Sequence, residues 1–123
     1  MLVNRKCRCL LGKKRYHILC ILFHMRYDEF WLKMYKSLRT KREFETLHRN
    51  SLFSAHSENS SIIITPKKSK FPRSITREKF QQVWNHASKL PTSERFKPGN
   101  YSKITHNSAY EVTLMYEFLK NKI

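Results

Sequence analysis

Three adjacent isoleucines, Ile62–Ile64, constrain the fold of this chain more than any other feature. Because isoleucine is branched at Cβ, such a run is typical of a buried β-strand. Pro66 cannot donate a hydrogen bond to a neighbouring strand, so we expect the strand to end there. A basic turn follows, then an amphipathic helix from about Thr76 to Leu90, on which Trp84 is the largest apolar side chain available to cover the strand.

The segments on both sides of this stretch predict further helices and strands. Residues 26–38 place apolar side chains at i, i+3, i+4 and i+7, which indicates an amphipathic helix whose aromatic stripe belongs to the core. Residues 43–48 and 52–55 are typical of short strands, and residues 57–60 of a polar turn. Residues 71–75 fit an edge strand, because Pro72 lacks the N–H that a central strand needs.

Local signals mark where two helices begin. Thr76 is a favourable N-cap residue, and Ser108 with Glu111 fits a capping box at the start of a last helix. Because strands and helices are segregated along the chain, we predict an α+β fold. It consists of a small antiparallel sheet of three or four strands with helices packed on one face, in a single domain over residues 25–123.

Residues 1–24 differ in kind from the rest, with six Lys and Arg residues, no acid, and all three cysteines of the chain. Their apolar run, Ile18–Phe23, is shorter than a signal-peptide core of about 7–15 residues and far shorter than a membrane span of roughly 20. Two interpretations stay open: a basic extension outside the fold, or an upstream segment that is not translated because synthesis starts at Met25. The absence of cysteine from the predicted core suits a reducing cytoplasm, where we expect the protein to reside.

Residue types that carry chemistry do not form a recognisable set. The cysteines Cys7, Cys9 and Cys20 with His24 do not match the spacing of structural zinc sites. Glu43 and Glu45 share one face of a predicted strand, but no second acidic element completes a Mg²⁺ site. We therefore predict no catalytic residue, no metal and no cofactor. A metal-free ribonuclease could use as acid and base any of His48, His56, His86 and His106.

The formal net charge of +16 points to polyanionic partners, nucleic acid first and an anionic membrane surface second. Alternatively, the lysine content follows from the base composition of the coding sequence and reflects no binding function. A basic turn that leads into a helix start can present cations and backbone N–H groups to phosphates together. Aromatic rings beside cations further along the chain suit stacking on unpaired bases. The predicted nucleic-acid-binding residues are Lys67, Lys68, Lys70, Arg73, Arg77, Lys79, Arg95 and Lys97.

The order of features over residues 44–123 resembles a known type of domain. Two strands and a polar turn precede the strand that ends at Pro66, Ile75–Phe80 opens the Trp-bearing helix, and residues 101–110 (YSKITHNSAY) precede a terminal helix. This order resembles a small domain of short bacterial reading frames that also occurs as a module beside DNA-processing enzymes. Its most specific part is Asn107-Ser108-x-Tyr110, although His106 stands where an arginine is expected. The resemblance implies the order of the fold and an association with DNA, but no assigned chemistry.

Three functions are consistent with these observations. The first is a non-enzymatic nucleic-acid-binding module that contacts phosphates of DNA or RNA through the turn and helix start at residues 67–79. The second is a protein-interaction or specificity module that acts beside a restriction or modification enzyme. The third is a small ribonuclease or toxin. No membrane span is expected, and the sequence does not indicate an oligomeric state.

Overall fold

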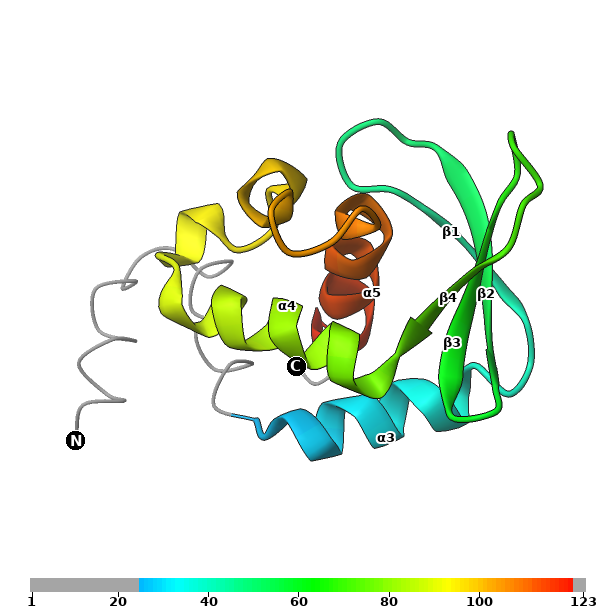
Figure 1. The fold of residues 1–123 in the computed structure, drawn as a ribbon, viewed down its shortest axis with the longest axis horizontal. Helices are drawn as coiled ribbons and strands as arrows, with labels where there is room; N and C mark the ends of the chain where they lie inside the picture. The colour runs from blue at the N-terminus through cyan, green and yellow to red at the C-terminus, as the bar shows by residue number, and fades with distance from the viewer. Residues whose placement is uncertain (1–24, 121–123) are drawn as a thin grey trace.

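The computed structural model describes residues 25–120, in which a four-stranded antiparallel sheet lies beside three α-helices (Figure 1). The predicted N-terminal extension, residues 1–24, lies outside the described residues. Two short 3₁₀ helices, η1 (Thr92–Glu94) and η2 (Pro98–Tyr101), follow the second helix. The α-helices are α3 (Tyr27–Ser37), α4 (Arg77–Lys89) and α5 (Ser108–Lys120), and the strands are β1 (Arg42–Glu45), β2 (Leu52–Glu58), β3 (Ser61–Pro66) and β4 (Arg73–Thr76).

The sheet is a meander in which each strand pairs with the next, in the order β1-β2-β3-β4. β3 ends at Pro66, as the sequence predicts. β2 is longer than predicted and continues to Glu58, because its polar end pairs in register with the start of β3. The two residues that join them, Asn59 and Ser60, have φ of 51° and 64°. This left-handed pair is typical of the tight hairpin turns that match the twist of a sheet.

The three helices cover one face of the sheet (Figure 1), which confirms the predicted α+β architecture. Ile62 and Ile64 are fully buried beneath the helices, whereas Ile63 points to the opposite face and is only partly buried. The alternation of the strand thus places two of the three isoleucines in the core. Fully burying each of these side chains contributes about 1.5–3 kcal/mol.

Aromatic side chains join the first two helices. Trp84 of α4 is 5 % exposed, and its ring centroid lies 4.7 Å from that of Phe30 and 5.6 Å from that of Tyr27, both on α3. Phe30 also lies 5.5 Å from the ring of Phe80. The aromatic stripe of α3 is therefore core, as predicted, and Trp84 belongs to the same core as the two buried isoleucines.

The two predicted helix caps have different outcomes. The Thr76 hydroxyl accepts a hydrogen bond from the Lys79 N–H at 3.2 Å, which confirms the N-cap of α4. The predicted capping box at α5 is wrong. α5 already includes Ser108, and the fully buried Glu111 carboxylate forms no hydrogen bond with the Ser108 N–H. The Glu111 side chain is thus buried in the core although the residue lies in the first turn of α5.

Candidate nucleic-acid interface

The basic turn, residues 67–70, projects from one end of the sheet between β3 and β4 (Figure 1). Its backbone is fixed, because the Lys67 N–H donates to the Leu52 carbonyl at 3.0 Å and the Lys70 N–H to the Pro66 carbonyl at 2.8 Å. The three lysine side chains of the turn are exposed, and within residues 25–120 none forms an ion pair with an acid. The turn therefore holds three solvent-facing cations on an ordered backbone.

A groove of about 620 Å³ lies beside the basic turn, and we name it the basic groove. Its walls come from the β1–β2 connection, the end of β3 with the turn, the start of β4, and the first turn of α5. None of the described residues that line it is acidic. The lining residues are Asn50, Ser51, Leu52, Pro66, Lys67, Lys68, Ser69, Arg73 and Tyr110.

Arg73 is held in place at the wall of this groove. One of its terminal nitrogens donates to Asn107 Oδ1 at 3.2 Å, and its guanidinium carbon lies 5.4 Å from the centre of the Tyr110 ring. The Tyr110 ring in turn meets the Phe53 ring edge-on, with centroids 5.0 Å apart. A guanidinium that is already ordered loses less conformational entropy when it binds a phosphate. The structure thus adds Asn107 and Tyr110 to the predicted site.

Arg77 and Lys79 lie at the opposite end of β4 from the basic turn, where α4 begins. Arg77 forms an ion pair with Asp28 of α3. The backbone N–H of Lys79 is occupied by the Thr76 cap, although its side chain is exposed. The predicted basic residues therefore form one group up to Arg73 and another at Arg77 and Lys79. Because β4 rises about 3.3 Å per residue, the two groups are roughly 10 Å apart along the strand.

The structure corrects the prediction for Arg95, which is buried at 8 % exposure. Its Nε donates to the carbonyls of Ala87 and Leu90, both at 3.0 Å, at the C-terminal end of α4. Both carbonyls lie at the end of the helix, and that of Ala87 also accepts from the Leu90 N–H at 3.1 Å. Arg95 therefore supports the fold, and we leave it out of the candidate interface.

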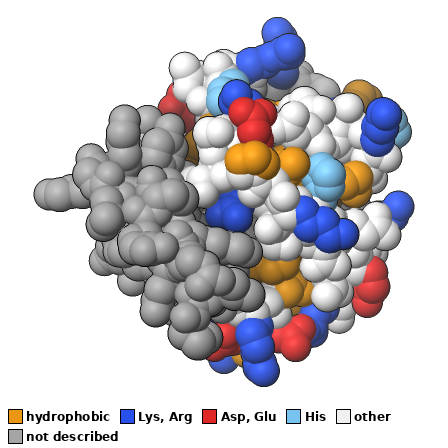
Figure 2. Space-filling model, turned by 90° about the vertical axis from the view of Figure 1, so that its left-hand side faces the viewer, with side chains coloured by type: hydrophobic (Ala, Val, Ile, Leu, Met, Phe, Trp, Pro, Cys, Tyr) orange, Lys and Arg blue, Asp and Glu red, His pale blue; other side chains and the backbone are white. Residues whose placement is uncertain are grey.

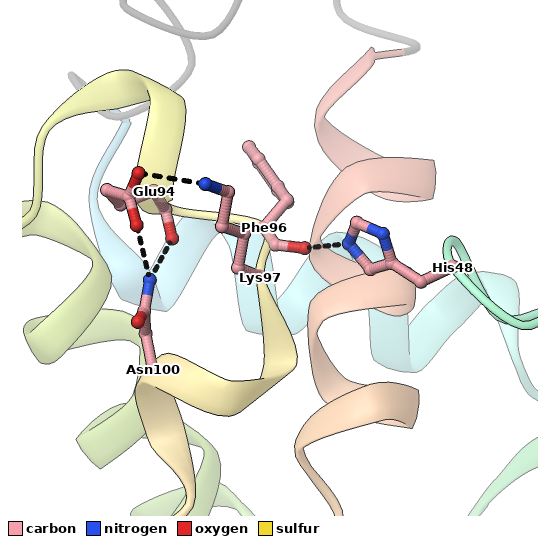
Figure 3. Close-up of polar contacts among 5 residues, drawn as sticks. All are labelled: His48, Glu94, Phe96, Lys97 and Asn100. Carbon is pink, nitrogen blue, oxygen red and sulfur yellow. Dashed lines mark hydrogen bonds and ion pairs between the residues drawn. The ribbon is translucent and has the colours of Figure 1, made fainter.

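Lys97 is exposed but already has an acidic partner, as its Nζ lies 3.0 Å from Glu94 Oε2 (Figure 3). Hydrogen bonds from Lys97 and Asn100 lower the pKa of the Glu94 carboxyl. The same loop is fastened to the β1–β2 connection, since His48 Nε2 lies 2.8 Å from the carbonyl oxygen of Phe96 (Figure 3). These contacts hold the loop, and the charge of Lys97 is partly compensated.

On one other face of the molecule, basic side chains do not gather in the same way. Figure 2 shows the face on the side of Figure 1 away from the sheet. On the described part of that face the Lys and Arg side chains are scattered, with acidic and hydrophobic side chains among them. The described part of this face therefore has no gathering of cations like that at the basic turn.

Three of the four histidines that could have served a ribonuclease have separate surroundings. His48 faces Phe96, His56 lies 3.0 Å from Glu58 on β2, and His86 packs edge-on against Tyr101. Within the described residues, no group of three or more His, Cys, Asp or Glu side chains could hold a metal ion. No helix in residues 25–120 combines the length and the apolar character needed to cross a membrane.

Comparisons with protein-family models, curated proteins and solved structures give no match for this chain. The resemblance to a module of DNA-processing enzymes therefore stays a prediction. The function has to be argued from the α+β fold and the basic groove themselves.

Proposed function

We propose that this protein is a non-enzymatic nucleic-acid-binding module that contacts phosphates through the basic turn and the basic groove. The contacting side chains are Lys67, Lys68, Lys70 and Arg73. Phosphate contacts need cations that water can reach, and these four side chains are exposed at one end of the sheet. Arg77 and Lys79 would extend the contact along β4 for a longer ligand.

The absence of acids from the basic groove is the observation that carries this proposal. Three cations line it, and each described neighbour in the lining is neutral. A nucleic-acid backbone would release counterions when it binds there, so the affinity should fall steeply with salt. Net charge alone would not produce this local arrangement, because the remaining basic residues include several that pair with Asp28, Glu94 and Glu117.

A pair of triple substitutions tests the proposal. Lys67→Glu, Lys68→Glu and Lys70→Glu together remove the cations of the turn. The control is Lys36→Glu, Lys89→Glu and Lys103→Glu, which changes the net charge equally at three exposed lysines outside the turn and the groove. Affinity for a labelled 20-mer is measured by fluorescence anisotropy at several salt concentrations, with circular dichroism as a check of the fold.

The turn variant should lose about tenfold or more in affinity, and the slope of log affinity against log salt should fall by about 2 to 3 if each lysine neutralises one phosphate. The control variant should lose several times less affinity than the turn variant. If both variants lose equally, binding reflects net charge alone and the site is wrongly placed. If the unmodified protein binds neither single strands nor duplex at low salt, the proposed function is wrong.

A further inference from the structure

We infer that the basic groove takes an unpaired nucleobase, so that the ligand is single-stranded nucleic acid in preference to duplex. This inference rests on the proposed function and names its substrate class. A surface that reads only the backbone of a duplex needs cations but no hollow for a base. The basic groove has both cations and a hollow for a base, and this is the reason to distinguish single-stranded nucleic acid from duplex.

The groove combines an apolar interior with a cationic rim. Leu52, Pro66 and Tyr110 supply apolar and aromatic surface, while Lys67 and Lys68 stand at its edge on the turn. Its volume of about 620 Å³ is within the range of roughly 300–1,000 Å³ that is usual for small-ligand sites. A nucleobase has flat faces that stack on apolar and aromatic side chains, and its phosphate is the anion that the rim would attract.

Polar groups around the same groove suit the edge of a base. Asn50 and Ser51 line it from the β1–β2 connection, and their backbone is fixed through Thr46, which is 5 % exposed. The Thr46 hydroxyl accepts from the Ser51 N–H at 3.0 Å. Arg73 has five N–H donors, and one bond to Asn107 leaves others to reach a phosphate or a base. Such fixed groups can hold one base in a defined orientation.

An exposed aromatic ring also follows the basic turn in the chain. Phe71, directly after the basic turn, is 74 % exposed, the largest value among the exposed large apolar side chains of the described residues. Water-facing aromatic rings beside lysines form the stacking platforms that bind successive bases of a single strand. Bases of a duplex are already stacked and would first have to be flipped out.

The inference is tested with three probes that carry equal numbers of phosphates per strand. These are a labelled single-stranded 12-mer of mixed sequence, the same 12-mer as a duplex, and an abasic 12-mer that keeps the backbone without the bases. The unmodified protein should bind the single strand about tenfold more tightly than the abasic strand, and more tightly than the duplex. One stacked base accounts for a difference of this size.

Two tyrosines of α5 provide a matched pair of variants. Tyr110 meets the Phe53 ring edge-on and lies 5.4 Å from the guanidinium carbon of Arg73. Tyr116 meets the Phe96 ring edge-on and lies 5.3 Å from Lys120 Nζ, but it does not line the groove. Tyr110→Ala should weaken single-strand binding about tenfold and abasic-strand binding by clearly less, because it removes stacking surface and also releases the Arg73 guanidinium that contacts phosphates. Tyr116→Ala should change neither.

The outcomes separate this inference from the proposed function. If duplex and abasic strands bind as tightly as the single strand, and all depend on the three lysines of the turn, the inference is wrong and the proposed function stands. If no probe binds, the proposed function itself is wrong. Should Tyr110→Ala fail to fold, amide NMR shifts of the unmodified protein with the single strand decide: changes at Asn50, Ser51 and Ser69 support the inference, and changes only elsewhere contradict it.

Discussion

Two of the hollows that Leu52 lines lie at the same end of the sheet, and the contrast in charge between them bears on the candidate site. The second hollow, which we name the acidic groove, has a volume of about 580 Å³ against about 620 Å³ for the basic groove, and Asn50 and Leu52 line both. Three glutamates and one arginine line the acidic groove, whereas two lysines, one arginine and no acid line the basic groove. The acidic groove is lined by Arg42, Glu43, Phe44, Glu45, Thr46, Leu47, Asn50, Leu52 and Glu117.

The two grooves are similar in volume but differ in charge. Both grooves contain an arginine beside an aromatic ring, but only the basic groove lacks carboxylates that would repel a phosphate. The alternation of β1 explains the difference. Phe44 points into the core, so Glu43 and Glu45 both face the opposite side of the sheet.

The largest expected effect is on the free energy of unfolding, and it concerns α5. This helix supplies Tyr110 to the basic groove and Glu117 to the acidic groove. Burial raises the pKa of Glu111 from 4.5 to about 7, although the Thr105 hydroxyl and Lys79 oppose the shift. Folding therefore favours the neutral carboxyl. The neutral carboxyl stabilises the fold fully below pH 4.5. This stabilisation is lost as the pH rises toward 7 and is absent at higher pH, a loss of about 3 kcal/mol in all.

Urea unfolding at pH 5 and pH 8 checks this prediction. Glu111→Gln cannot ionise, so its free energy of unfolding should fall by about 2.5 kcal/mol less between these two pH values than that of the unmodified protein. A buried amide also lowers the absolute stability of the variant, so only the change with pH is compared. An equal fall in both proteins would show that other groups cause it. The two grooves are best compared near pH 6, where α5 keeps part of this stabilisation.

The next prediction tests the contrast between the grooves directly, through their two arginines. Arg73 contacts the Tyr110 ring and bonds to Asn107, and Arg42 lies 5.2 Å from the Phe44 ring and bonds to Ser37 at 2.8 Å. Arg73→Gln should weaken nucleic-acid binding about tenfold, since hydrogen bonds to charged groups contribute about 1.5–3 kcal/mol. Arg42→Gln should change binding less than about twofold, because Glu43 and Glu45 keep phosphates away. Equal losses would mean that the grooves do not differ in function.

Much of the fold could be predicted because its signals are local. The isoleucine run, Pro66, the Thr76 cap and the burial of Trp84 each follow from residue type and spacing, and the structure contains all of them. The end of β2 could not be predicted in this way. Its residues 57–58 are polar, and they form a strand only because β3 lies beside them.

The candidate site was predictable only in part, because its walls meet across long stretches of chain. The basic turn is one continuous segment, and its lysines are exposed as expected. Arg73 meets Asn107, 34 residues away, through a contact that spacing cannot show. For Tyr110, the sequence signal is the Asn107-Ser108-x-Tyr110 motif. The burial of Arg95 could not be predicted, because a buried arginine near the end of a helix has the same sequence signature as one on the surface.

The smallest expected effect separates backbone strain from charge at the edge of the basic groove. Lys70 has φ of 64°, a region that costs a side-chain-bearing residue about 1–2 kcal/mol, and Asn50, which lines both grooves, has φ of 53°. Lys70→Gly should stabilise the fold by about 0.5–1 kcal/mol and still weaken binding severalfold, because it relieves the strain but removes a cation. Asn50→Gly should change stability by a few tenths of a kcal/mol, since asparagine tolerates this conformation. Thermal unfolding and anisotropy measure the two effects separately, and a Lys70→Gly variant that binds as well as the unmodified protein would remove Lys70 from the interface.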